Sequence, residues 1–345
     1  MSASEITKAK SNVSESLEGC QFSPGTKKGH YESYFLRANH PTQAQAFWIR
    51  YTLFSPKGHT DRAIGEIWAM FFDGEKNKVV AVQENIPFDD CTVFSEKVSL
   101  RLGKNILEKG TLSGSSSLNG HTIKWDLSYS GEEKPLLFFP ERLYHTPLPK
   151  AKSLVTAPNV KFKGTLSVDA ETWDIDSWQG SENHNWGSKH TDEYAWGQVA
   201  GFDNDSNVFL ECSTARIKLG PIWSPWMTLA VIRIEGKEYK FNSVGQAIKA
   251  NGAYDYNQDC FNWQFETHNA DTKLKVNISG PSEQFIGLTY KNPPGGTHTC
   301  LNSKIASCEL ILTEKGHSPK IFKTKHRAAF EVLTDDKHHG IKVLN

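Results

Sequence analysis

The sequence lacks a long apolar run, a paired set of cysteines and an excess of charge of either sign. Its apolar stretches fall short of the about 18–20 residues that span a bilayer. Residues 1–20 have no apolar core of signal-peptide length. We therefore expect a cytoplasmic protein with no integral membrane segment, although transient membrane contact is compatible with this. Lys plus Arg and Asp plus Glu both total 39, so no overall positive field favours nucleic acid as a partner.

Cysteine usage and phosphate-binding patterns exclude further classes. Six cysteines are scattered over 345 residues without a Cys-x-x-Cys pair, and a chain of this length needs no disulfide to hold its core. We expect them to be mostly reduced and structural, and a Cys300–Cys308 disulfide is left open. Pro293–Gly296 is not followed by the helix with Lys and Ser or Thr that a nucleotide loop needs, and we read it as a hairpin tip.

Metal-binding patterns are equally sparse. His184 and His190 lie near Asp192, but their spacing matches neither a helical His-x-x-x-His pair nor a cysteine-rich zinc site. We therefore predict no metal ion and no other cofactor.

Aromatic side chains are abundant: ten Trp, ten Tyr and nineteen Phe, against three Met. Such rings favour strands and line binding cavities. Runs of β-type residues recur at short intervals between turn formers, as in an antiparallel barrel or sandwich. Helical signals are confined to Asp169–Ser177 and Ser243–Lys249. The sequence therefore predicts an all-β fold with few short helices.

The chain is long enough for two domains of ordinary size. Residues 1–30 are polar with few apolar anchors, and we expect them to be flexible. Strand patterns fill residues 31–150, pause at 151–158 and resume over 159–345. Because proline cannot donate to a central ladder, we place a proline-containing linker at 151–158, between an N-terminal and a C-terminal antiparallel barrel.

One segment, residues 183–198, combines imidazoles, carboxylates and large aromatics in a predicted turn and strand. The strand alternates with a period of two, so Tyr194, Trp196 and Gln198 share one face while the other face is nearly bare. A wide aromatic face beside a polar turn is typical of a pocket for a flat or elongated apolar molecule. The predicted ligand contacts are Asn183, Asn185, Tyr194, Trp196, Gln198, Glu66 and Trp68.

These contacts have plainer interpretations that the sequence leaves open. Tyr194 and Trp196 are equally consistent with core packing. Glu66 is as well explained by a pair with Arg50 or Arg62 as by a place beside a ligand.

Several segments resemble the tandem lipocalin-like proteins, a family that includes AttH-like proteins and carotenoid 1,2-hydratase (hydroxyneurosporene synthase). The matching segments are Glu32–Arg37, Phe47–Leu53, Glu66–Ala69 and Asn183–Gly187. Similarity to AttH-like members runs from Tyr31 to near the C-terminus, whereas similarity to the hydratases is confined mainly to the turn around His184 and Trp186. The resemblance implies two lipocalin-like barrels side by side, a ligand cavity between or within them, and isoprenoid or polyene substrates handled without redox cofactor or metal.

The resemblance also implies catalytic roles, since the His and Trp of a His-Asn-Trp-Gly turn are implicated in catalysis in the hydratases. The matching residues here are His184 and Trp186. Hydration of an electron-rich alkene needs a proton donor and an aromatic shield for the cation. Asp192 or Glu193 could be the acid, because burial keeps a carboxyl protonated, and His184 could position the water. The alternatives are a structural turn and, for the two acids, a solvated strand edge or a pair with Lys189.

The sequence therefore predicts a protein that binds a hydrophobic small molecule, isoprenoid, polyene or polyketide-like. It also predicts cofactor-independent acid–base chemistry on that molecule, by a hydratase (lyase) or a cyclase or isomerase. The alternative is a non-catalytic, lipocalin-like carrier of an apolar ligand. The sequence leaves the oligomeric state open.

Overall fold

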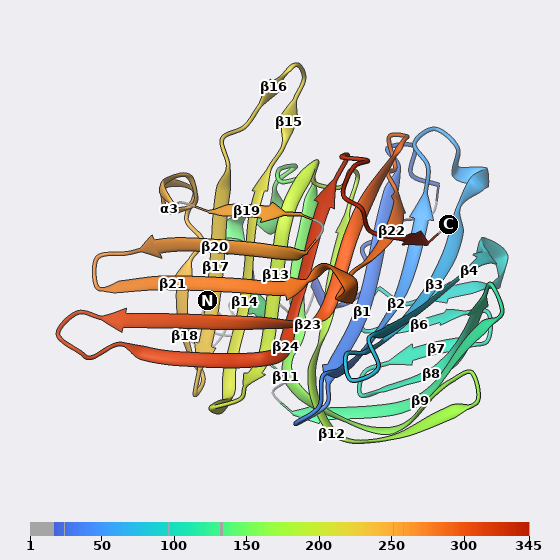
Figure 1. Cartoon of the computed structure of the whole chain (residues 1–345). Helices are drawn as coiled ribbons and strands as arrows, with labels where there is room; N and C mark the ends of the chain where they lie inside the picture. The colour runs from blue at the N-terminus through green and yellow to red at the C-terminus, as the bar shows by residue number, and fades with distance from the viewer. Residues whose placement is uncertain are drawn as a thin grey trace, which may run out of the picture.

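The computed structural model describes residues 17–23, 25–95, 97–131, 134–250, 252–257 and 259–344. Over these ranges the chain forms two large antiparallel sheets that lie side by side (Figure 1). None of the helices in these ranges has the length and apolar character needed to cross a bilayer. Residues 1–16 of the predicted flexible segment lie outside the described residues, and its last residue, His30, opens the first strand.

The first sheet has the order β4-β3-β2-β1-β12-β11-β9-β8-β7-β6-β5, with β10 paired to β11. Its strands are β1 (His30–Asn39), β2 (Gln45–Ser55), β3 (Ile64–Asp73), β4 (Lys78–Pro87), β5 (Cys91–Val93), β6 (Ser99–Leu102), β7 (Asn105–Glu108), β8 (Thr111–Leu118), β9 (His121–Gly131), β10 (Leu136–Leu137), β11 (Ala151–Val168) and β12 (Glu171–Gly187). Strand β4 also packs against β8 and β9, which curls the sheet into a barrel.

The second sheet has the order β18-β17-β14-β13-β24-β23-β21-β20-β19, and β22 pairs with both β23 and β25. Its strands are β13 (Glu193–Phe202), β14 (Asp205–Arg216), β17 (Met227–Ile234), β18 (Lys237–Phe241), β19 (Ala253–Tyr256), β20 (Cys260–His268), β21 (Thr272–Pro281), β22 (Ile286–Lys291), β23 (Thr297–Glu314), β24 (Lys320–Thr334) and β25 (Val343–Leu344). The helix α3 (Val244–Lys249) packs between β17 and β20. The prediction of an all-β fold with two antiparallel barrels is confirmed.

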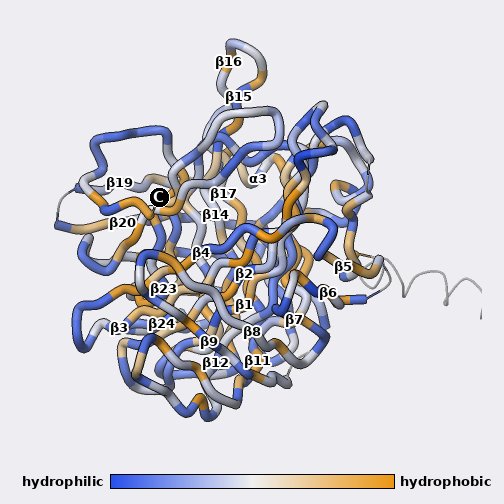
Figure 2. Tube along the Cα trace, turned by 90° about the vertical axis from the view of Figure 1, so that its right-hand side faces the viewer, coloured by the Kyte–Doolittle hydropathy of each residue, from blue (hydrophilic) through white to orange (hydrophobic). Residues whose placement is uncertain are grey.

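Short 3-10 turns and one small hairpin complete the chain. The 3-10 turns are η1 (Thr60–Arg62), η2 (Phe88–Asp90), η3 (Glu141–His145) and η4 (Ser282–Gln284). Strands β15 (Lys218–Leu219) and β16 (Ile222–Trp223) form a separate hairpin that projects from the molecule (Figure 1). Away from this hairpin, apolar segments concentrate on the central strands and hydrophilic segments on the outer loops (Figure 2).

Burial along the strands shows where the two sheets meet. In β9 and β21, buried and exposed residues alternate, because one face fills a barrel and the other meets water. In β2 every residue is buried, and β1 and β3 are buried almost throughout. Their inner face fills the first barrel, and their outer face packs against β23 of the second sheet.

Residues 151–158, predicted as a linker, form the first part of β11, and the first sheet continues to Gly187. Pro158 falls in a bulge of the β11–β12 ladder, between the pairs Ala157–Glu182 and Val160–Gly180. A bulge tolerates the missing N–H of proline, which is why the proline does not end the strand. Division of the chain into two domains, 31–150 and 159–345, stays a prediction.

The two helical predictions had different outcomes. The Ser243–Lys249 signal is confirmed: α3 opens with a capping box in which Ser243 and Gln246 exchange side-chain and backbone hydrogen bonds. The prediction for Asp169–Ser177 is wrong, because most of this segment belongs to β12, paired with β11. There the cross-strand pairing overrides a short amphipathic pattern.

Candidate functional site

Strand β13 presents the predicted aromatic face toward the first sheet. Tyr194 and Trp196 pack into the core between the sheets, and Gln198 reaches Arg37 of β1. The opposite face points into the second barrel, where a Cβ at Gly197 would collide with Ile278 and Trp263. The nearly bare face is thus required by close packing inside that barrel.

A cavity of about 120 Å³ lies between the two sheets. Its aromatic wall consists mainly of Tyr31, Phe35, Trp48, Tyr194, Trp196 and Tyr290. Strands β1 and β2 supply the first three rings, and β13 and β22 supply the others. Of the seven predicted ligand contacts, Asn185, Tyr194 and Trp196 line this cavity.

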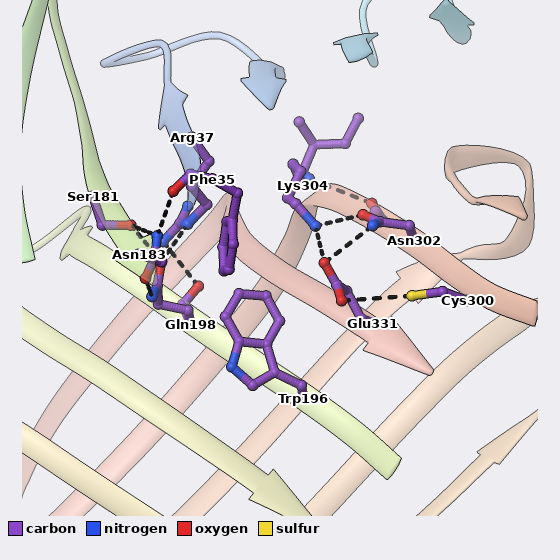
Figure 3. Close-up of polar contacts among 12 residues, drawn as sticks. Phe35, Arg37, Ser181, Asn183, Trp196, Gln198, Cys300, Asn302, Lys304 and Glu331 are labelled. Carbon is purple, nitrogen blue, oxygen red and sulfur yellow. Dashed lines mark hydrogen bonds and ion pairs between the residues drawn. The ribbon is translucent and has the colours of Figure 1, made fainter. Parts of the chain in front are cut away.

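Polar groups beside the cavity form two hydrogen-bonded clusters, and Phe35 and Trp196 lie between them (Figure 3). In the first cluster, the Gln198 amide accepts from Arg37 and Ser181 and donates to Asn183 and Glu211, at distances of 2.6–2.7 Å. All four hydrogen-bonding positions of the Gln198 amide are therefore occupied. Gln198 and Asn183 hold the sheets together and lie outside the cavity wall.

Glu211, on β14, is a buried carboxyl group of the first cluster. It is fully buried, and it accepts hydrogen bonds from Trp196 Nε1 at 2.8 Å and from Gln198 Nε2 at 2.7 Å. Desolvation outweighs these donors and raises the pKa of Glu211 to about 7. Glu211 does not line the cavity, but Trp196, which donates to it, does.

The second cluster centres on Glu331 of β24, whose side chain lines the cavity. Its carboxylate accepts from Lys304 Nζ at 2.7 Å and from Asn302 Nδ2 at 3.0 Å, and Tyr194 Oη lies 3.4 Å away. Burial lowers the pKa of Lys304, although the nearby Glu331 favours its charged form. Cys300 Sγ lies 3.5 Å from the same carboxylate. The Glu331–Lys304 ion pair thus lies directly behind this part of the cavity wall.

His190 is the imidazole that lines the cavity. Its ring stacks on Tyr31 with centroids 3.8 Å apart. Desolvation, and then the nearby charge of Arg50, lower the pKa of His190 well below its ordinary value. At neutral pH His190 is therefore uncharged.

His184 and Trp186, predicted as catalytic residues of a turn, lie within β12 and outside the cavity wall. Both belong to the face of β12 opposite to Asn185. The His184 ring stacks between Tyr34, at 4.1 Å, and Trp186, at 4.4 Å. Gly187 has no positive φ, and a Cβ there would overlap the carbonyl oxygen of Lys150. The prediction of a turn at this motif is wrong.

Two buried polar contacts fix the ring of His184. Its Nδ1 lies 2.9 Å from the carbonyl oxygen of Leu17, and its Nε2 lies 2.7 Å from Glu32 Oε1. Desolvation opposes ionisation of Glu32, but hydrogen bonds from His184 and His30 outweigh it and lower the pKa of Glu32 to about 2. Both ring nitrogens of His184 thus have a buried oxygen partner, and a catalytic role for His184 stays a prediction.

Asp192 and Glu193, the predicted acids, are paired with cations at the start of β13. Asp192 lies 2.5 Å from Lys189 Nζ, and Glu193 lies 2.6 Å from Arg216 Nε. Neither side chain lines the cavity. The alternative of a pair with Lys189 describes Asp192 well.

Glu66 and Trp68 face the second sheet beside the cavity. Glu66 pairs with Lys291 at 2.7 Å, a partner other than the two arginines considered from the sequence. Trp68 packs edge-on to Tyr290, with ring centroids 6.4 Å apart. Both residues support the cavity wall from behind.

Sequence reasoning missed Arg50, His190, Glu211 and Glu331 as site residues. The available signals were the place of His190 within residues 183–198 and, at Arg50 and Glu331, a charged residue in the middle of an otherwise apolar stretch of strand. Within the described ranges, no three His, Cys, Asp or Glu side chains gather as a metal site would require. All six cysteines are unpaired, including Cys300 and Cys308.

Comparison with curated proteins gives a partial match. No family model matches the chain. Two uncharacterized proteins of Mycobacterium tuberculosis, MT0513 and Rv0493c, are each 25% identical over 199 residues, which cover 57% of this chain and 58% of theirs. The match thus spans less than two thirds of those relatives.

Solved structures share the fold over most of their length. The protein NE1406 of Nitrosomonas europaea, provisionally named AttH, superposes with a TM-score of 0.58 at 11% identity, covering 93% of this chain and 97% of that one. Kievitone hydratase from Nectria haematococca superposes with a TM-score of 0.54 at 12% identity, covering 93% of this chain and 92% of that one. CghA superposes with a TM-score of 0.52 at 12% identity, covering 93% of this chain and 95% of that one. The chain therefore has the fold of AttH and of these two proteins, and a specific likeness to carotenoid 1,2-hydratase stays a prediction.

Proposed function

We propose that this protein binds a hydrophobic small molecule in the cavity between its two barrels and catalyses cofactor-independent acid–base chemistry on it. The observation that carries the proposal is an aromatic cavity with an uncharged imidazole, His190, and a carboxylate, Glu331, in its wall. Apolar walls with a few polar groups are typical of ligand sites. The shared fold with kievitone hydratase supports hydration as the first reaction to test.

The size of the cavity limits the part of the substrate that enters it. A volume of about 120 Å³ is close to the roughly 150 Å³ that holds benzene in an engineered apolar cavity. A single ring fits this space, whereas a long carotenoid chain does not. We therefore propose a substrate whose reacting part is one ring or a short unsaturated chain.

The wall offers defined roles for the reaction. His190 has an uncharged ring in the cavity wall, so it can accept a hydrogen bond from a hydroxyl group of the substrate or from an attacking water. Burial raises the pKa of Tyr194 and of Tyr290 well above the ordinary value, so both phenols stay protonated and donate hydrogen bonds.

The second candidate is a carrier that binds the same ligand unchanged. The observation in its favour is that the polar groups behind the cavity are paired: Glu331 with Lys304, and Glu211 with Trp196 and Gln198. Fixed networks of this kind hold a pocket in shape without moving protons.

Native mass spectrometry of the protein purified from its own host tests both candidates. We expect a bound molecule that organic solvent releases, and conversion of that molecule when it is returned to ligand-free protein. His190→Gln should retain binding and lose conversion, whereas Trp196→Ala should weaken binding. Trp223→Ala, on the exposed β15–β16 hairpin, is the matched control. Unchanged ligand in every case would favour the carrier, and absence of any ligand effect at Trp196 would refute the proposed site.

A further inference from the structure

Three polar atoms in the cavity wall are buried without a hydrogen-bond partner. They are the indole Nε1 of Trp48, the guanidinium Nε of Arg50 and the amide Oδ1 of Asn185. Trp48 is 1% exposed and Arg50 is 5% exposed. Buried donors and acceptors are nearly always satisfied by protein, water or ligand. Two unfilled donors and one unfilled acceptor on one cavity therefore indicate the groups that a bound molecule supplies.

Arg50 also lacks the anion that a buried guanidinium requires. Its Nη2 donates to Ser33 Oγ at 2.7 Å, and its Cζ lies 4.5 Å above the ring of Tyr290. Burial opposes the charged form of Arg50, but Tyr290, Glu66 and Glu331 outweigh it and raise the pKa of Arg50. Even so, no carboxylate of the described residues lies within ion-pair distance of Arg50, so its guanidinium has room for an anionic partner.

Arg37, on the same face of the first sheet, shows the contrast. It is 1% exposed, yet its Nε, Nη1 and Nη2 all donate, to Gln198, Asn39 and backbone oxygens. The fold can therefore satisfy a buried arginine at this interface with its own acceptors. It does so for Arg37, away from the cavity, whereas Arg50 Nε, at the cavity, has no hydrogen-bond partner.

The charges around the cavity point the same way. Arg50 and Lys152 line the wall as cations. Glu331 lines it as well, but Lys304 neutralises that carboxylate at 2.7 Å, and Lys291 neutralises Glu66 at the same distance. Each of these two carboxylates thus has a lysine within ion-pair distance, whereas Arg50 has no carboxylate at that distance.

We propose that the cavity is a receptor for an organic anion: a flat apolar ring that carries a carboxylate, phenolate or enolate oxygen. The anionic oxygen accepts from Arg50 Nε and from the indole N–H of Trp48. Asn185 Oδ1 accepts from a hydroxyl group of the same molecule. The aromatic wall packs against the ring. This assignment rests on the proposed function and narrows its substrate class.

Titration with matched single-ring probes tests the assignment. Benzoate, benzamide and toluene share a ring and differ in charge, and quenching of tryptophan fluorescence reports binding, because Trp48 and Trp196 line the cavity. We expect benzoate to bind the native protein more tightly than benzamide or toluene. Arg50→Gln should weaken benzoate about 10- to 100-fold, the loss typical of a hydrogen bond to a charged group, and leave toluene unchanged.

Controls separate the possible outcomes. Arg101→Gln, at an exposed arginine of β6, should change nothing, and Arg50→Lys serves if the glutamine variant does not fold, with an intermediate loss expected. Equal affinity for the three probes, or no effect at Arg50, would overturn the anion receptor and leave the apolar cavity in place. Failure of every probe to bind the native protein would overturn the proposed function together with this assignment.

Discussion

Replacement of Glu211 by glutamine should change how the stability of the protein depends on pH. Folding raises the pKa of this carboxyl from 4.5 to about 7. A raised carboxyl pKa means that the folded state binds the proton more tightly than the unfolded state. The free energy of unfolding therefore falls as the pH rises from about 4.5 to about 7, and the loss amounts to about 3 kcal/mol above that range.

The glutamine variant isolates this contribution. Its amide oxygen can accept from one of the two donors, Trp196 Nε1 or Gln198 Nε2, and its NH2 group faces the other. That mismatch costs the same at every pH, since neither donor titrates. We therefore expect the stability difference between variant and native protein to shift by about 2.5 kcal/mol in favour of the variant between pH 5 and pH 8.

Urea unfolding at pH 5 and pH 8 measures this shift, with Glu108→Gln on the exposed side of β7 as the matched control. The control difference should not depend on pH. A Glu211→Gln difference that is the same at both pH values would refute the reasoning, because it would mean that Glu211 titrates alike in the folded and unfolded states.

Three further predictions follow from the buried groups. Gly187→Ala should destabilise the protein by about 1–3 kcal/mol, because its Cβ would overlap the backbone of Lys150, whereas Gly245→Ala, with open space around it, should not; chemical denaturation compares the two. Since folding lowers the pKa of Glu32 to about 2, its contribution is present above pH 4.5 and lost as the pH falls toward 2, and Glu32→Gln should flatten that acid branch. In a thiol-reagent assay of the native protein, the exposed Cys260 should react first; simultaneous reaction of all six thiols would contradict the packing.

The features predicted correctly from the sequence are those set by local patterns. The alternation of Tyr194 and Trp196 with Ala195 and Gly197 fixes which side chains share a face of β13. The serine that opens α3 is visible because a capping box has a fixed spacing. Both signals lie within a few residues, so no partner strand is needed to interpret them.

The features missed depend on pairing between distant strands. Residues 183–187 combine polar and aromatic side chains on both faces because β12 is buried on both sides, so they lack the alternation of a half-exposed strand. Arg50 and Glu331 meet the same cavity from different sheets, and no local pattern brings them together. The sequence contains the residues, but their meeting depends on how the sheets pack.

The alternation of cavity-facing and barrel-facing residues on β1, β2 and β13 has a consequence for diversification. Each cavity position, such as Phe35 or Trp196, neighbours in sequence a residue that points into a barrel interior, such as Leu36 or Ala195. A substitution at a cavity-facing position changes the shape of the cavity, while the hydrophobic core of each barrel stays intact. A few substitutions at cavity positions therefore suffice to change which ligand binds, without disturbing the cores on which folding depends.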